Sequence, residues 1–156
     1  MNVPDLQRRH LLASGLALGL ASVGSARAQA GPLMEVWKDP QCGCCHDWIS
    51  HVEKGGWRVL VRDVGNNAVR ASLGMPQRLG SCHTARVQGY VIEGHVPVRE
   101  IQRLLRERPV ALGLAVPGMP VGSPGMDGAV YGGRRDRYEV LLVLRDGRTE
   151  VFQTYS

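Results

Sequence analysis

The sequence predicts a single α/β domain with a mixed β-sheet. Three observations support this fold class: a length of 156 residues, apolar patterns that alternate between strand-like and helical periods, and two closing strand-like segments joined by Asp146-Gly147. A chain of this length builds one hydrophobic core. Strands that alternate with helices are typical of a layered α/β structure.

The first 28 residues have the three parts of an export signal. A twin-arginine pair, Arg8-Arg9, precedes an apolar run over 11–23 that is too short to span a bilayer well. Ala26-Arg27-Ala28 matches an A-x-A cleavage site. We therefore expect a twin-arginine-type signal peptide over 1–28 and a periplasmic domain over 29–156, with no membrane attachment after cleavage. An uncleaved membrane anchor is the alternative.

The net charge excludes one class of partner. The chain has 19 Lys and Arg residues against 14 Asp and Glu residues, and the predicted signal peptide contains three of the arginines and one aspartate. The remaining excess of positive charge is small, and its one cluster, at 134–137, has few aromatic neighbours. We therefore expect no nucleic-acid partner.

The first half of the mature chain predicts a strand, a cysteine-rich loop, a helix, a second strand and a short helix. Leu33–Trp37 alternates apolar and polar residues as a strand does. A second strand is expected over 57–63, and Asn66 or Asn67 is expected to cap the short helix. The longer helix ends at Gly55-Gly56, and its apolar stripe consists of Cys45, Trp48, Ile49 and Val52.

The second half predicts two short strands, a helix, a long loop and a hairpin. The short strands cover 84–87 and 90–92, and the helix runs from Pro97 to Pro109. The segment 113–126 is rich in glycine, proline and methionine, so it is expected to be an irregular loop. The closing strand-like segments, Tyr138–Leu144 and Thr149–Tyr155, are expected to form the β-hairpin.

Four cysteines carry the chemistry, and three of them lie at the junction of the first strand and the first helix. Cys42 and Cys45 form a C-x-x-C motif where a helix N-terminus stabilises a thiolate, which is the thioredoxin arrangement. Cys44 complicates a simple dithiol because a third thiol competes in disulfide exchange. On a regular helix Cys44 projects away from the other two, so a bent backbone is needed to bring it to the same centre.

Cys82-His83 supplies the fourth thiol and an imidazole at the start of another strand. Clusters at strand ends meet at one end of a sheet, so we expect Cys82 to join the first three cysteines. Three kinds of site stay open at this point. They are a disulfide from Cys42 or Cys44 to Cys82, a zinc site, and a copper site, since thiolate and thioether favour Cu(I).

The remaining candidate ligands are methionines and histidines. Met119 and Met126 lie in the long loop and offer thioether sulfur, although each can equally be a packing residue. His83 is the preferred histidine because it adjoins Cys82. His46 is a ligand, a modifier of thiolate pKa or a solvated residue, whereas His95 is expected to serve the turn at 93–95.

Four segments together resemble one known family. KDPQCGCCHDW, LGSCHTARVQGYVIEGHVP, GLAVPGMPVGSPGM and YEVLLVLRDGRTEVFQTY are similar, in this order, to the CopG-type periplasmic copper-resistance proteins, long catalogued as a domain of unknown function. The resemblance implies a thioredoxin-like fold. It also implies that Cys42, Cys44, Cys45 and Cys82 hold copper as a thiolate-bridged cluster, with His83, Met119 and Met126 as further candidate ligands.

The activity that the resemblance implies is the interconversion of Cu(I) and Cu(II) in copper resistance. Copper ions, and other periplasmic copper-resistance proteins, are the implied partners. A thiol-disulfide oxidoreductase and a passive copper chaperone are the alternatives. The oxidoreductase requires Cys42 as an exposed nucleophile and Cys45 as the resolving thiol.

Overall fold

The computed structural model describes residues 31–156, so the predicted signal peptide lies outside it and stays a prediction. Within that range no helix has the length and apolar character needed to cross a membrane. The elements are β1 (Leu33–Lys38), α1 (Gly43–Lys54), β2 (Arg58–Arg62), α2 (Asn67–Ser72), β3 (His83–Val87), β4 (Tyr90–Glu93), α3 (Val98–Glu107), β5 (Gly113–Ala115), β6 (Tyr138–Val143) and β7 (Thr149–Tyr155), with 3₁₀ turns at Gln77–Leu79 and Ala129–Tyr131.

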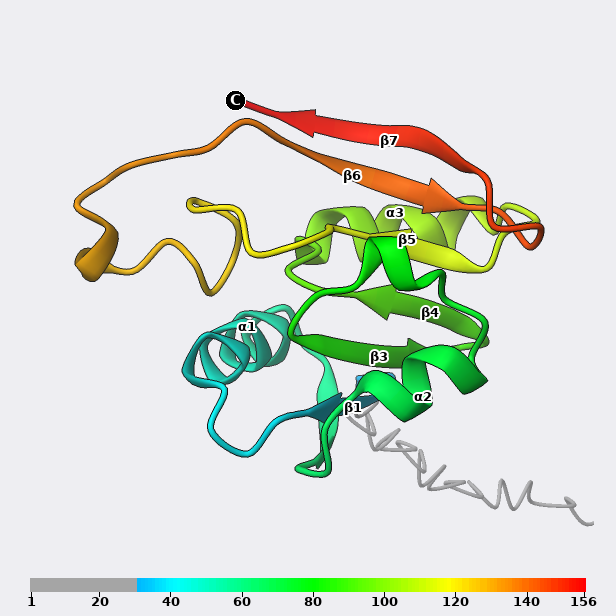
Figure 1. Ribbon diagram of the computed structural model, residues 1–156, viewed down its shortest axis with the longest axis horizontal. Helices are drawn as coiled ribbons and strands as arrows, with labels where there is room; N and C mark the ends of the chain where they lie inside the picture. The colour runs from blue at the N-terminus through cyan, green and yellow to red at the C-terminus, as the bar shows by residue number, and fades with distance from the viewer. Residues whose placement is uncertain (1–30) are drawn as a thin grey trace, which may run out of the picture.

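The strands of residues 31–156 form one mixed sheet in the order β2-β1-β3-β4-β5-β6-β7 (Figure 1). Two neighbouring pairs are parallel, β1 with β2 and β4 with β5, and the other pairs are antiparallel. The predicted α/β domain with a mixed sheet is therefore confirmed. The expected C-terminal hairpin is also present as β6 and β7.

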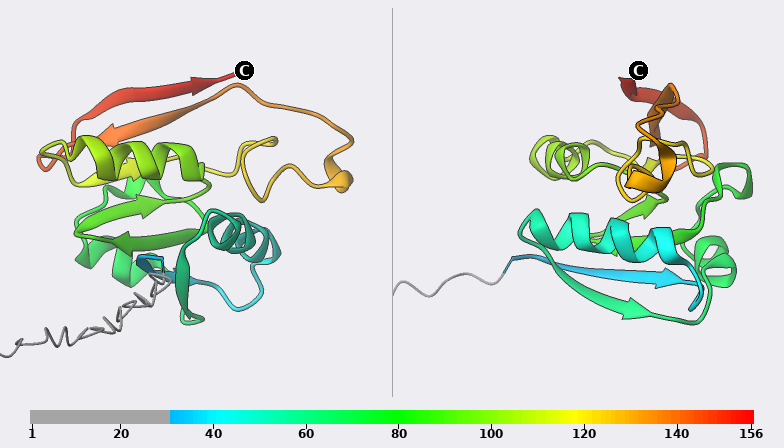
Figure 2. Two further views of the ribbon diagram at one scale, coloured as in Figure 1. Left: turned by 180° about the vertical axis from the view of Figure 1, so that it is seen from behind. Right: turned by 90° about the vertical axis from the view of Figure 1, so that its left-hand side faces the viewer.

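Apolar side chains cover both faces of this sheet. On one face α1 and α3 pack on the strands in the main core, to which Trp48 and Ile101 contribute fully buried side chains. On the other face the segment from α2 to the first 3₁₀ turn packs Met75 and Leu79 against a smaller core. Figure 2 shows α2 and α3 on opposite sides of the sheet. Burial on both faces explains why β3, β4 and β5 have almost continuous buried residues.

Helix α1 forms where the apolar stripe predicted it. The stripe residues Cys45, Trp48, Ile49 and Val52 are all buried, while the other face of the helix is polar. The indole Nε1 of Trp48 donates a hydrogen bond to the carbonyl oxygen of Val96 at 2.9 Å. This contact ties the cysteine-bearing helix to the chain that follows β4.

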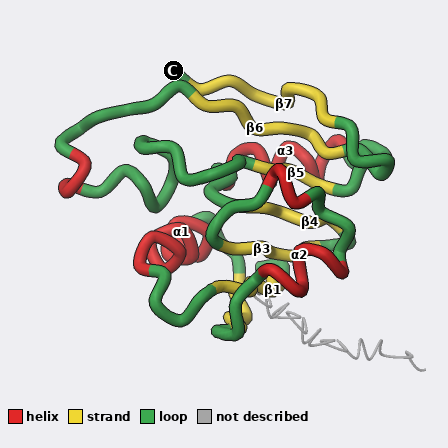
Figure 3. Tube along the Cα trace, in the orientation of Figure 1, coloured by secondary structure: helices red, strands yellow, loops and turns green. Residues whose placement is uncertain are grey.

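The segment 113–126 is only partly the irregular loop that its composition predicted. Its first three residues form β5, which pairs with β4 and β6 in the sheet. Gly113 is required there, since a Cβ at this position would lie 1.7 Å from the carbonyl oxygen of Val91. From residue 116 onward the prediction was right. Figure 3 shows that most of the chain between β5 and β6 is loop.

Candidate metal centre

The loop between β1 and α1 has its own local support. The backbone N–H groups of Gln41 and Cys42 donate to the side chain and the carbonyl of Asp39, at 2.8 and 3.1 Å. Lys38, the last residue of β1, is buried; its ammonium contacts Asp63 at 2.7 Å and donates to the Asp39 carbonyl at 3.0 Å. These contacts fix the direction in which the chain enters α1.

The four cysteines converge at one end of the sheet, as the sequence predicted. Their sulfur atoms all lie within 4.8 Å of one another. The Sγ of Cys44 lies 3.6 Å from that of Cys42 and 3.9 Å from that of Cys82. Such spacing lets the sulfurs share one metal centre.

Cys44 joins the group because Cys42 is not helical. Cys42 is the N-cap of α1 with φ −74° and ψ 95°, an extended conformation, and the helix begins at Gly43. The helical spacing that predicted Cys44 on the far side therefore does not apply between these two residues. This bend places the sulfurs of Cys42, Cys44 and Cys45 together.

Two of the cysteines are joined in a disulfide. The bond links Cys42 and Cys45, not Cys42 or Cys44 to Cys82 as the disulfide alternative had it. Cys44 and Cys82 are free and partly exposed. Because thiolate is the form that binds metal, the full set of four sulfur ligands exists only after this bond is reduced.

His83 is buried in the core next to Cys82. The ring is fully buried, with Nδ1 3.4 Å from the Sγ of Cys82 and its centroid 4.2 Å from that of Trp48. Its other nitrogen, Nε2, is buried without a hydrogen-bond partner among the described residues. An unsatisfied buried nitrogen costs on the order of 1–3 kcal/mol, so its retention beside a thiol points to a functional role.

His95 is the ligand candidate that the sequence analysis missed. Its Nε2 lies 3.0 Å from the Sγ of Cys82, and Cys82, His83 and His95 form a second group with metal-binding spacing. Nδ1 donates to the carbonyl oxygen of Pro124 at 2.8 Å, so Nε2 is the unprotonated nitrogen of the neutral ring. The usable signal was its position two residues after β4, whose last residue pairs with Thr84, close to Cys82.

The pKa shifts favour the uncharged forms of Cys82, His83 and His95. Burial, together with the neighbouring Cys44, raises the pKa of the Cys82 thiol to about 12. Burial lowers the pKa of His95 and brings that of His83 well below its ordinary value. The thiol of Cys82 therefore faces a neutral imidazole, and a metal ion that binds there has to displace the thiol proton.

The two loop methionines lie in different surroundings. The Sδ of Met119 lies 4.0 Å from the Sγ of Cys44, and its side chain is half exposed. The Sδ of Met126 instead accepts a hydrogen bond from the hydroxyl of Tyr131 at 3.2 Å. Met119 is therefore placed to complete the cysteine group, whereas the contact of Met126 lies within its own loop.

The donor set is suited to a soft metal ion. It combines up to four thiolates, a thioether and two imidazoles, and these ligands favour Cu(I), while imidazole also accepts Cu(II). The donors come from the N-cap and first turn of α1, the start of β3, the turn after β4 and the loop after β5. The carboxyl ends of β1, β4 and β5 meet at this edge.

Comparisons with known proteins agree with this chemistry. A family profile described as a protein of unknown function, DUF411, matches residues 79–126. Two solved structures of copper resistance protein CopG, form 1 and form 2, are each 44% identical to this chain, with TM-scores of 0.74 and 0.75. The matches cover 80% and 81% of this chain and 98% and 99% of those chains. Comparison with curated proteins gave no match.

Proposed function

Since this chain belongs to the family of copper resistance protein CopG, we propose that it binds copper through its cysteine cluster as part of copper resistance. The observation that carries this proposal is the convergence of four cysteine sulfurs within 4.8 Å. Export to the periplasm through the predicted signal peptide belongs to the same proposal. Other periplasmic copper-resistance proteins are the partners that would deliver or accept the copper.

The cluster supports more than one copper ion. Cys44 lies between Cys42 and Cys82, so its thiolate can bridge metal ions bound on either side. His83 and His95 each have a ring nitrogen close to the sulfur of Cys82, and the thioether of Met119 lies close to the sulfur of Cys44. In this proposal Cys44 would bridge copper ions, the other cysteines would complete their coordination, and the imidazoles and Met119 would be terminal ligands.

The test is an anaerobic Cu(I) titration of the fully reduced protein. We expect uptake of more than one copper ion per chain, and loss of most of it when Cys42, Cys45 and Cys82 are replaced together by serine. His46→Gln, on the exposed face of α1, is the control and retains full uptake. No uptake, or equal uptake by the triple variant, would end the proposal.

The proposed redox activity uses Cys42 and Cys45 as the source of electrons. Two Cu(II) ions each accept one electron, the two thiols form the disulfide seen in the structure, and two protons leave to solvent. An external thiol reductant then restores the dithiol. Placement of the disulfide next to free Cys44 and Cys82, which keep bound copper close, supports this step.

Anaerobic addition of Cu(II) to the reduced protein tests the redox step. We expect two Cu(I) ions, trapped by a chromophoric Cu(I) chelator, for each disulfide detected by mass spectrometry. The double variant C42S/C45S should lack this reduction. Binding of Cu(II) without any Cu(I) would instead identify a passive copper chaperone.

A thiol-disulfide oxidoreductase is the alternative that one observation favours. Cys42 is partly exposed and Cys45 is fully buried, which are the positions expected of an attacking and a resolving thiol. Rapid reduction of insulin by rigorously metal-free protein would support this function. It would also show that copper is not required for turnover.

A further inference from the structure

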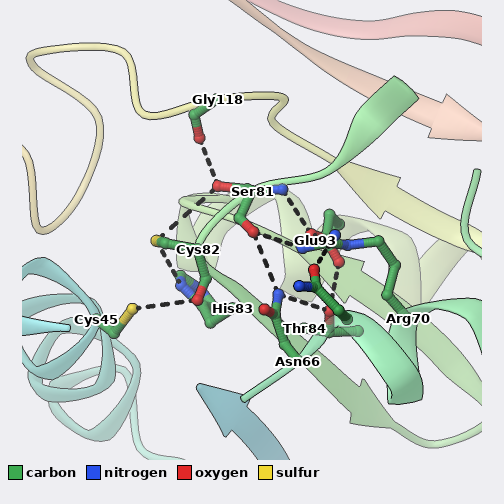
Figure 4. A network of polar contacts seen from close by, with 10 residues as sticks. Cys45, Asn66, Arg70, Ser81, Cys82, His83, Thr84, Glu93 and Gly118 are labelled. Atoms are coloured by element: carbon green, nitrogen blue, oxygen red, sulfur yellow. Dashed lines mark hydrogen bonds and ion pairs between the residues drawn. The ribbon is translucent and has the colours of Figure 1, made fainter. Parts of the chain in front are cut away.

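Ser81, which precedes Cys82, is held by charges buried under the sheet edge. Its backbone N–H donates to Oε1 of Glu93 at 2.7 Å. Its carbonyl oxygen accepts from Nη2 of Arg70 at 2.5 Å and from Nδ2 of Asn66 at 3.2 Å. Figure 4 shows these contacts around Ser81. Both backbone polar groups of this one residue are therefore fixed by side chains.

The charged groups that hold Ser81 are themselves buried and hydrogen-bonded. Arg70 and Glu93 form an ion pair at 2.8 Å, and their side chains are 4% and 0% exposed. The hydroxyl of Thr84 donates to the second carboxylate oxygen of Glu93 at 2.6 Å. Burial raises the pKa of Glu93, and the hydrogen bonds from Thr84, Ser81 and Arg70 oppose that shift. The main effect of a buried ion pair whose hydrogen bonds are all made is to fix one arrangement of the surrounding chain. Its contribution to the free energy of unfolding is smaller.

The side chain of Ser81 points the other way, toward the long loop. Its hydroxyl donates a hydrogen bond to the carbonyl oxygen of Gly118, and the N–H of Gly118 donates to the Gly80 carbonyl at 3.3 Å. Gly94 leaves the space for this side chain, since a Cβ there would lie 2.5 Å from the Ser81 hydroxyl. Ser81 thus joins the buried network to the loop residue that precedes Met119.

We propose that Ser81 is a positioning residue that holds the Met119 thioether over the cysteine cluster for Cu(I). The inference rests on the proposed copper function. Met119 is half exposed, so packing alone restrains it weakly, and its sulfur lies 4.0 Å from that of Cys44. A thioether is a soft ligand that favours Cu(I), whereas protein zinc sites use thiolate, imidazole and carboxylate, so the contact favours Cu(I) over zinc.

A double-mutant cycle between Ser81 and Met119 tests the inference. Cu(I) affinity of reduced protein is measured anaerobically by competition with a chromophoric Cu(I) chelator, and Zn(II) affinity is measured alongside. We expect Ser81→Ala and Met119→Leu each to weaken Cu(I) binding about tenfold, as loss of an orienting partner does, and the double variant to be no weaker. Zn(II) affinity should stay unchanged. Ser72→Ala, which removes a hydroxyl-to-carbonyl hydrogen bond on α2, is the matched control.

Two results would overturn the inference. One is Cu(I) affinity in Ser81→Ala equal to that of wild type. The other is a loss that multiplies with Met119→Leu to about a hundredfold, because Ser81 would then act elsewhere, for example through Cys82, whose sulfur lies 4.0 Å from its hydroxyl. If wild type and Ser72→Ala bind no Cu(I), the proposed function is wrong, and the role of Ser81 inferred from it is wrong as well.

A measurement on metal-free protein separates the contact from copper binding. Amide hydrogen exchange at Gly118 and Met119 should speed up in Ser81→Ala and not in Ser72→Ala, while the backbone links to Arg70 and Glu93 remain. Unchanged exchange in this loop would show that the hydroxyl does not hold Met119 in place.

Discussion

His95 contacts the proposed metal centre with one ring nitrogen and the long loop with the other. Nδ1 donates to the carbonyl of Pro124, and this contact turns Nε2 toward the thiol of Cys82. The ring is fully buried. The sequence assigned His95 to a turn, but in the structure its ring presents a nitrogen to the thiol of Cys82.

Replacement of His95 should weaken copper binding selectively. We expect His95→Gln to lower Cu(I) affinity at least about tenfold, because an imidazole that faces Cys82 is lost while the four thiols remain. Chelator competition on the reduced protein measures the change. His46→Gln serves as the control on α1, and equal affinity in both variants would remove His95 from the ligand set.

His83 predicts the pH dependence of stability in the metal-free protein. Burial holds its pKa well below the ordinary value, so the folded state binds fewer protons than the unfolded state once the pH falls below about 6.5. The contribution of His83 to the free energy of unfolding is therefore fully present above that pH and is lost progressively below it. One such group gives a slope of at most about 1.4 kcal/mol per pH unit.

Denaturant unfolding between pH 7.5 and 5 measures this slope. His83→Phe, which keeps an aromatic ring against Trp48, should reduce the slope without abolishing it, since burial also lowers the pKa of His51 and His95. An undiminished slope in His83→Phe would show that the acid sensitivity arises elsewhere.

Among the elements, the loop from β5 to β6 contributes most to the site after the cysteine loop. It contributes Met119, orients His95 through Pro124 and packs on α1 through Gly125. Gly125 has φ +83°, and a Cβ there would lie 2.7 Å from both the Cys44 carbonyl oxygen and the Trp48 nitrogen. The loop can approach the helix this closely only with glycine at that position.

Gly125→Ala should therefore push the loop away from α1. We expect a loss of about 1–3 kcal/mol in unfolding free energy and a matching decrease in Cu(I) affinity, as the added methyl meets backbone atoms. Gly128→Ala is the matched control, because its φ is −67° and its Cβ would meet nothing within 4 Å. Similar stability and affinity in the two variants would contradict this packing.

At the scale of the whole molecule, local patterns predicted most elements, and long-range contacts decided what they missed. The stripe of α1 and the Asp146-Gly147 hairpin depend on neighbouring residues, and both were predicted correctly. Strand β5 was hidden by its glycine- and proline-rich context, because only pairing with β4 and β6 makes its three residues a strand. The more specific thioredoxin-like assignment stays a prediction.

The same division applies to the candidate site. Convergence of Cys82 with the first three cysteines followed from strand ends meeting at one edge of the sheet. The role of His95 could not be read from its neighbours, because it depends on Pro124, 29 residues away. The pairing of Cys42 with Cys45, and the entry of Cys44 into the group, depend on the extended N-cap of α1.

Anomalous diffraction at the copper absorption edge tests whether copper binds at the cysteine cluster. Crystals of the reduced, Cu(I)-loaded protein should show anomalous peaks within bonding distance of the sulfurs of Cys42, Cys44, Cys45 and Cys82, with further contacts to His95 and Met119. Peaks confined to surface histidines, with none at the four sulfurs, would show that copper does not bind at the cysteine cluster.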